Sequence, residues 1–185
     1  HCPISAIDTF NRGLSRRAAI YIDYPQAVPL AYAIDTDRCI GCGLCARVCP
    51  ASAVRYNQQL KDEVVHVGAV ILAPGYEVFN ARLKGEYGYG IYPNVVTSIE
   101  FERMLSASGP YGGHIQRPLD KKEPGKIAFI QCVGSRDPSR GIRYCSSACC
   151  MYATKEAIIA KEHLSTIQPT IFYMDIRAFG KGFDQ

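Results

Sequence analysis

Four cysteines within residues 39–49 constrain this chain more than any other feature. They follow the pattern C-x2-C-x2-C-x3-C, and Pro50 comes directly after the last of them; they are Cys39, Cys42, Cys45 and Cys49. Bacterial-type ferredoxins use this spacing to hold a [4Fe–4S] cluster. Gly41 and Gly43 lie between the cysteines and give the backbone the freedom that a tight loop around a cluster needs. The pattern therefore predicts an iron–sulfur site and a role in electron transfer.

Zinc is the alternative occupant of such a site. Pairs of cysteines in C-x2-C spacing also bind zinc, but structural zinc sites usually place a long spacer between two such pairs. Here all four cysteines fall within residues 39–49. We therefore favour an iron–sulfur cluster, and keep as the alternative a zinc-stabilised structural or docking module without redox activity.

Composition restricts the class of protein further. With 185 residues, of which 48% are hydrophobic, the chain can bury a core and form one or two domains. The net charge is only +4 and the basic residues are scattered, so nucleic acid is not an expected partner. No apolar run approaches the roughly 20 residues of a membrane span. Because the nine cysteines are clustered as metal ligands are, we expect a reducing, cytoplasmic location.

The chain opens with a second Cys-Pro pair, Cys2-Pro3, which resembles the end of another cysteine motif. We therefore expect an internal fragment of a longer protein. In two-cluster ferredoxins the fourth cysteine of each motif ligates the other cluster. Cys2 would then complete the cluster of Cys39, Cys42 and Cys45, and Cys49 would serve a different one. The alternative is that Cys49 closes its own cluster.

The pattern of the chain changes after the first cysteine motif. We predict a ferredoxin-like part over residues 1–57, ending in a short helix or turn at 51–54, and a partial α/β domain over residues 58–185. Residues 64–72 are β-branched and apolar, which predicts a buried strand that leads into Ala73, Pro74 and Gly75. Nucleotides bind at such strand ends in doubly wound folds, although an ordinary loop has the same pattern. A short helix is predicted at 98–104, capped by Thr97 or Ser98.

A second group of cysteines lies in the predicted α/β part. Residues 126–131 read as a buried strand that ends at Cys132, and a helix reaching about His163 is predicted to start near Ser146 or Ser147. The remaining members, Cys145, Cys149 and Cys150, lie near the start of that helix. Backbone N–H groups and the helix dipole favour an anionic cluster there. Buried free cysteines would explain any one of the four, whereas all four together predict a second cluster.

Several stretches of this sequence resemble the A-subunit family of heterodisulfide reductase. They are CVGSRD at 132–137, YCSSACCMYATK at 144–155, DIRAFG at 175–180 and YPQAVP at 24–29. The resemblance covers nearly the whole chain, and its C-x12-C-x3-C-C arrangement is specific. It implies an α/β fold with an inserted ferredoxin-like α+β part, as a fragment of a thioredoxin-reductase-like FAD/NAD(P)-binding fold.

The resemblance also implies cofactors, ligands and partners. The second cysteine group would hold an unusual [4Fe–4S] cluster near a flavin. Ala73-Pro74-Gly75 is similar to the Ala-Thr-Gly flavin contact of the family, with Pro74 in place of threonine. The implied function is that of an oxidoreductase subunit that passes electrons between FAD and [4Fe–4S] clusters in the full-length protein, some relatives by flavin-based bifurcation. Implied partners are the other subunits of such a complex and ferredoxin or hydrogenase-type electron donors. We predict no catalytic side chain and no catalytic competence for the fragment alone.

Overall fold

The computed structural model describes residues 1–183. The chain divides into two compact units. The first comprises His1–Ala6, Arg17–Ile22 and Gln26–Val78, and the second comprises Ile7–Arg16, Asp23–Pro25 and Phe79–Gln185. This division differs from the boundary at residue 57 that the sequence suggested, because residues 58–78 group with the first unit and two short segments near the start group with the second.

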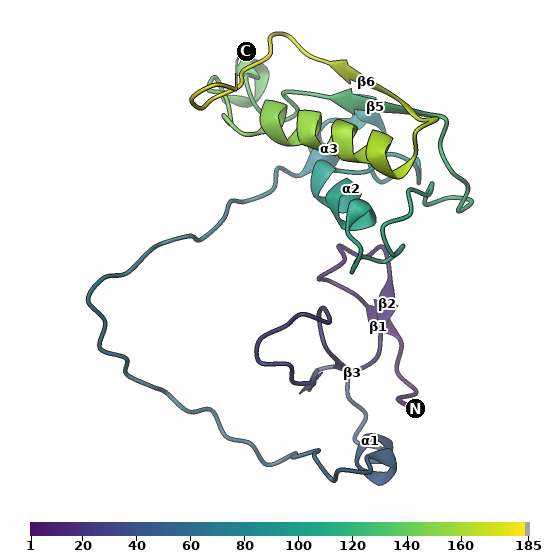
Figure 1. The fold of residues 1–185 in the computed structure, drawn as a ribbon, viewed down its shortest axis with the longest axis vertical. Coiled ribbons are helices and arrows are strands. Elements are labelled where there is room, and N and C mark those ends of the chain that lie inside the picture. Colours follow the sequence, from purple (N-terminus) through teal and green to yellow (C-terminus); the bar gives the residue numbers. More distant parts are fainter. Residues whose placement is uncertain (184–185) are drawn as a thin grey trace. The chain divides into compact units, whose positions relative to one another are not determined.

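The first unit is built from short elements (Figure 1). Strand β3 (Ile20–Tyr21) pairs antiparallel with β4 (Ala33–Ile34), and α1 (Leu44–Val48) follows the first cysteines. Gly43 caps α1 in the left-handed region at φ 72°, a conformation that glycine adopts without a side-chain clash. Helix α1 thus ends before Pro50. Of the two alternatives predicted for 51–54, a short helix or a turn, the structure has a turn, which covers residues 50–51.

Two further strands mark the points where the chain passes from one unit to the other. These are β1 (Ala6–Ile7) and β2 (Arg16–Arg17), which pair with each other. Within the first unit, Arg17 forms an ion pair of 2.9 Å with Asp35, and the Asp35 N–H donates to the Ala19 carbonyl at 2.8 Å. These contacts join the end of β2 and the residue before β3 to the residue that follows β4.

The predicted strand at 64–72 does not form. Its apolar side chains, including Val64, Val70 and Ile71, are exposed, and the segment runs as an irregular extended chain (Figure 1). A strand is stable only when its backbone N–H and C=O groups pair with a neighbour. Within residues 1–183 this segment has no strand partner, so an apolar, β-branched sequence alone did not make it a strand.

The second unit contains a parallel pair of strands joined through a helix. Strand β5 (Lys126–Ile130) pairs with β6 (Gln168–Phe172) in a register that places Lys126 opposite Gln168, and α3 (Cys149–His163) connects them. The unit also contains α2 (Ser98–Leu105) and three short 3₁₀ helices, η1 (Ala81–Leu83), η2 (Gly85–Tyr87) and η3 (Pro138–Arg140). The predicted strand at 126–131, the helix reaching His163 and the helix at 98–104 are confirmed.

The core of the second unit lies among α2, α3 and β6. Its buried members are Phe101, Met104, Leu105, Ile115, Ala160 and Ile167. A capping box between Thr97 and Glu100 starts α2, so the N-cap is Thr97, one of the two residues that the sequence predicted for it. Strand β5 is not buried on both faces, however, because only Ile127 and Phe129 turn toward the core while alternate residues are exposed.

Helix α3 also carries a buried carboxyl group. Glu156 is only 5% exposed, and its Oε2 atom has no hydrogen-bond partner within the part of the chain that the structure describes. Burial, together with the charge of Glu102, raises the pKa of Glu156 to about 8. A carboxyl whose pKa is raised on folding is protonated preferentially in the folded state, so it favours folding at low pH.

We therefore expect Glu156 to make the second unit less stable as the pH rises. Its favourable contribution is complete below about pH 4.5 and is lost as the pH passes about 8. In denaturant titrations from pH 5 to pH 9, Glu156→Gln should gain roughly 2–4 kcal/mol over the parent chain, since one pKa unit corresponds to about 1.4 kcal/mol. Glu162→Gln, at an exposed position of the same helix, is the control and should follow the parent. A constant difference between Glu156→Gln and the parent would contradict this assignment.

Candidate metal centres

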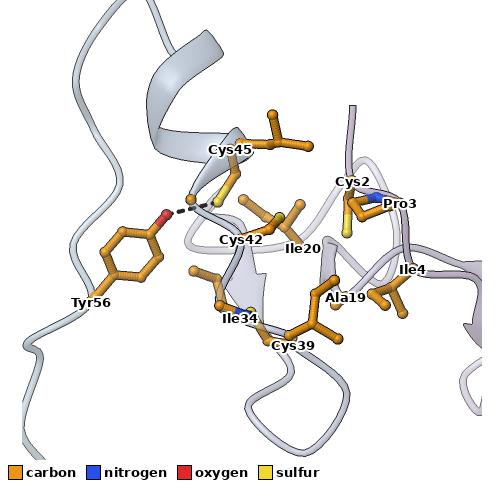
Figure 2. Close-up of a pocket in the computed structure, with 14 residues that line it drawn as sticks. Cys2, Pro3, Ile4, Ala19, Ile20, Ile34, Cys39, Cys42, Cys45 and Tyr56 are labelled. Carbon is orange, nitrogen blue, oxygen red and sulfur yellow. Dashed lines mark hydrogen bonds between the residues drawn. The ribbon is translucent and has the colours of Figure 1, made fainter.

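Four thiol groups of the first unit surround one pocket. Cys39 and Cys42 come from the loop before α1, Cys45 lies on α1, and Cys2 comes from the start of the chain. Figure 2 shows the four side chains around this pocket. Cys49 does not line the pocket, because it lies just beyond the end of α1. The fold thus brings together three cysteines of the motif with the distant Cys2.

Apart from Tyr56, the remaining lining of the pocket is apolar. Ile20 of β3 and Ile34 of β4 contribute to it, together with Ile4, Ala19 and Leu44. The antiparallel register places Ile20 directly opposite Ile34. No carboxylate or histidine is among the residues that line this pocket. Soft thiolate ligands without carboxylates select iron–sulfur clusters, zinc or copper(I) over harder ions.

Three of the four cysteine sulfur atoms around the pocket also have hydrogen-bond partners. The Gly41 N–H donates to Cys39 Sγ at 3.5 Å, and the Tyr56 hydroxyl lies 3.0 Å from Cys45 Sγ. The backbone N–H of Ile4 is the main cause that lowers the pKa of Cys2. A lowered pKa favours the thiolate, which is the form that binds metal.

Cys49 has its own hydrogen-bonding environment outside the pocket. The Ala53 N–H donates to Cys49 Sγ at 3.3 Å and is the main cause that lowers the pKa of Cys49. The lowered pKa favours the thiolate form of Cys49 as well, although Cys49 does not line the pocket.

Within residues 1–183, no group of three or more His, Cys, Asp or Glu side chains is arranged to hold a single metal ion. A [4Fe–4S] cluster makes a different demand, because each cysteine binds a different iron atom and the thiols surround the cluster. The donor set of the pocket, four thiols in an apolar lining, fits such a cluster.

The second cysteine group lies where the sequence predicted, at a strand end and a helix start. Cys132 follows β5 in the left-handed region at φ 61°, and the buried Cys149 and Cys150 open α3. Cys145 lies in the loop before the helix. The Gln131 side chain donates to the Cys149 carbonyl at 3.1 Å, which ties the strand end to the helix start.

The predicted serine cap of this helix is wrong. Ala148 is the N-cap residue and provides no side-chain hydrogen bond. Ser147 instead adopts a left-handed φ of 62°, and its N–H donates to Cys145 Sγ at 3.3 Å. The N–H of Ser146 donates to Ser135 Oγ at 3.3 Å. The serines therefore shape the cysteine loop and do not cap the helix.

Two charged residues that sequence reasoning did not assign lie beside these thiols. Arg136 forms an ion pair with Asp175, which also contacts Arg177 at 3.3 Å. The positive charge of Arg136 also acts on Cys132, whose pKa it lowers. Burial raises the pKa of Cys132, and the neighbouring Cys149 charge adds to the effect. Arg136 supplies the positive charge that opposes both effects. Both residues lie in stretches that carry the family resemblance, CVGSRD at 132–137 and DIRAFG at 175–180, and that resemblance is the sequence signal that could have identified them.

The comparisons with known proteins agree with this chemistry. A family described as a 4Fe-4S binding domain matches residues 32–55, a range that contains the first cysteine motif but not Cys2. The chain is 51% identical, over 100% of its length, to the iron–sulfur A subunit of CoB–CoM heterodisulfide reductase from Methanocaldococcus jannaschii. Over its whole length, the chain belongs to the A-subunit family of heterodisulfide reductase.

Other members of this family match equally fully. Identity is 52% to the A subunit of the H2/formate:CoB–CoM heterodisulfide,ferredoxin reductase of Methanococcus maripaludis. It is 45% to the A subunit of the ferredoxin:CoB–CoM heterodisulfide reductase of Methanosarcina mazei. Each match covers 100% of this chain, which spans 28% of the length of the first relative and 23% of the second.

The residues that resemble the flavin contact of the family do not line the cysteine pocket of their own unit. Ala73, Pro74 and Gly75 are exposed and lie in the irregular segment of the first unit. Gly75 has a φ of 74° and open space where a Cβ atom would lie.

Across residues 1–183, no helix has the length and apolar character that crossing a membrane requires.

Proposed function

We propose that this chain is an electron-transfer part of a heterodisulfide-reductase-like oxidoreductase, passing electrons between a flavin and [4Fe–4S] clusters. The observation that carries the proposal is the set of four thiols around one apolar pocket, formed by Cys2, Cys39, Cys42 and Cys45. The identity of 45–52% to heterodisulfide reductase subunits over the whole chain supports it.

The residues of the chain would divide the work between two sites. The thiols of the first pocket would hold one cluster, and Cys132, Cys145, Cys149 and Cys150 would hold a second. Bound clusters supply one-electron transfer. The protein supplies the thiolate ligands, the backbone N–H groups directed at sulfur and an apolar lining that limits the access of water. At the second site, Arg136 would offset part of the negative charge of the thiolates.

We propose that the flavin is bound by a larger fold of the full-length protein, of which this chain is a part. In it a thioredoxin-reductase-like FAD/NAD(P)-binding domain carries the ferredoxin-like part, and Ala73, Pro74 and Gly75 approach FAD. The relatives are named for heterodisulfide, ferredoxin, H2 and formate. We propose partners of the same kind for this chain, namely the other subunits of such a complex and a ferredoxin or hydrogenase-type donor. We also propose flavin-based bifurcation in the full-length protein and a cytoplasmic location, since thiolate ligands persist in reducing compartments.

Reconstitution tests this proposal against a zinc-stabilised module. We expect the 185-residue chain, reconstituted without oxygen in equal iron and zinc with sulfide, to bind ~8 iron and ~8 sulfide, enough for two clusters. It should show the broad visible absorption of iron–sulfur proteins. Metal, acid-labile sulfide and absorbance are measured on the same sample. A colourless chain with stoichiometric zinc would establish the zinc module instead.

Removal of the metal should loosen the first unit selectively. Among the hydrophobic residues that the structure describes as buried, Ala19 alone belongs to that unit, so ligand bonds must supply much of its order. We expect chelation to increase hydrogen exchange throughout residues 33–50, while the core of α2 and β6 keeps its protection. Equal loss of protection in both regions would contradict this expectation.

A further inference from the structure

Tyr56 makes a contact with the first cysteine group that no cysteine spacing reveals. Its hydroxyl oxygen lies 3.0 Å from Cys45 Sγ, as the dashed line in Figure 2 shows. The tyrosine also lines the same pocket as the four thiols. Its side chain therefore reaches back to the pocket from a position beyond the end of the motif.

The direction of this hydrogen bond follows from the chemistry of the ligand. In the proposed cluster Cys45 would bind iron as a thiolate, which has no proton to donate. A phenol keeps its proton at neutral pH, since its ordinary pKa is about 10. In the loaded protein the Tyr56 hydroxyl must therefore donate to Cys45 Sγ, and a donor to an ionised acceptor makes a strong hydrogen bond.

We infer that Tyr56 is a positioning residue that raises the reduction potential of the cluster held by Cys2, Cys39, Cys42 and Cys45. The inference rests on the proposed function, because it requires that cluster. Reduction adds one electron from a one-electron donor; no bond forms or breaks, and the hydroxyl proton stays on the tyrosine. The added negative charge spreads onto the cysteine sulfurs, so the hydrogen bond is stronger in the reduced state and favours it.

The contact of Tyr56 is suited to a test because it comes from a side chain. The Gly41 N–H that donates to Cys39 Sγ belongs to the backbone, so a change of side chain at that position would not remove it. Tyr56→Phe removes only the hydroxyl and leaves the ring against the pocket. Tyr32 offers a matched control, since it belongs to the same unit, is 70% exposed and does not line the pocket.

The experiment is a redox titration of the reconstituted chain and its two variants, followed by the electron paramagnetic resonance signal of the reduced ferredoxin-type cluster. We expect Tyr56→Phe to make reduction about threefold to tenfold less favourable, a lowering of about 30 to 59 mV for a one-electron couple. Tyr32→Phe should keep the potential of the parent chain. An unchanged potential in an iron-loaded Tyr56→Phe chain would overturn the inference while leaving the proposed function intact.

A second measurement applies if Tyr56→Phe does not assemble the cluster. Incorporation of 3-fluorotyrosine into the Tyr32→Phe chain and into the parent strengthens the phenol as a donor while keeping its size. We expect the potential to rise in both samples, since both retain Tyr56. No rise in either sample would overturn the inference. A parent chain that binds no iron would instead overturn the proposed function, and the inference with it.

Discussion

Replacement of Cys2 by serine is expected to impair the ferredoxin-type cluster, whereas Cys49→Ser should spare it. The physical reason is position. Cys2 lines the pocket with Cys39, Cys42 and Cys45, while Cys49 Sγ lies outside that lining and accepts a hydrogen bond from Ala53. The spacing of the motif alone leaves the fourth ligand open between Cys2 and Cys49.

The test compares both variants with the parent after identical anaerobic reconstitution. We expect Cys2→Ser to lose most of the resonance signal of the reduced ferredoxin-type cluster and about one cluster's worth of iron. Cys49→Ser should retain both. Cys39→Ser is the positive control, since both assignments make Cys39 a ligand. The reverse pattern, with loss in Cys49→Ser and retention in Cys2→Ser, would show that the motif closes its own cluster.

Replacement of Cys149 or Cys150 by alanine should abolish the other cluster and leave the ferredoxin-type signal in place. Both cysteines are buried at the start of α3, in a different unit from the pocket of the first cysteines. Loss of either thiolate removes a ligand that the loop before α3 cannot replace, and it leaves the apolar pocket of the first unit unchanged.

Spectra of the reduced variants, together with iron and sulfide analysis, provide the measurement. Each variant should keep about half of the iron of the parent. Ala153→Ser, one turn along α3 at another buried position, controls for disturbance of the helix and should keep both signals if the fold is retained. Removal of all iron, or of none, would refute the assignment of two separate sites.

Sequence patterns succeeded where the local signal and the final structure agree. Helix α2 could be predicted because its start is a local signal. Its N-cap Thr97 and Glu100 form a capping box with each other and lie only three residues apart. Strand β5 and helix α3 could be predicted because each belongs to a continuous β-α-β unit that the chain contains. The placement of Cys132 and Cys149 followed from those two elements.

The same reasoning failed where a structure depends on a partner. Residues 64–72 have the composition of a buried strand, yet backbone pairing within residues 1–183 is missing and the segment stays irregular. The serine cap predicted for α3 failed for a related reason. Ser146 and Ser147 are engaged in the cysteine loop through Ser135 and Cys145, and this arrangement depends on contacts that no local pattern encodes.

The amino-acid sequence by itself determined the family of this protein and predicted its ligand chemistry. Thiol side chains and their spacing are local properties, so metal binding could be predicted for residues 39–49 and 132–150 before any fold was known. Only the tertiary structure decided which cysteine joins Cys39, Cys42 and Cys45 around the pocket, and that Tyr56 reaches Cys45. Both contacts depend on the path of the backbone through the β3–β4 pair and past α1, and that path is set by pairing and packing between residues far apart in the chain.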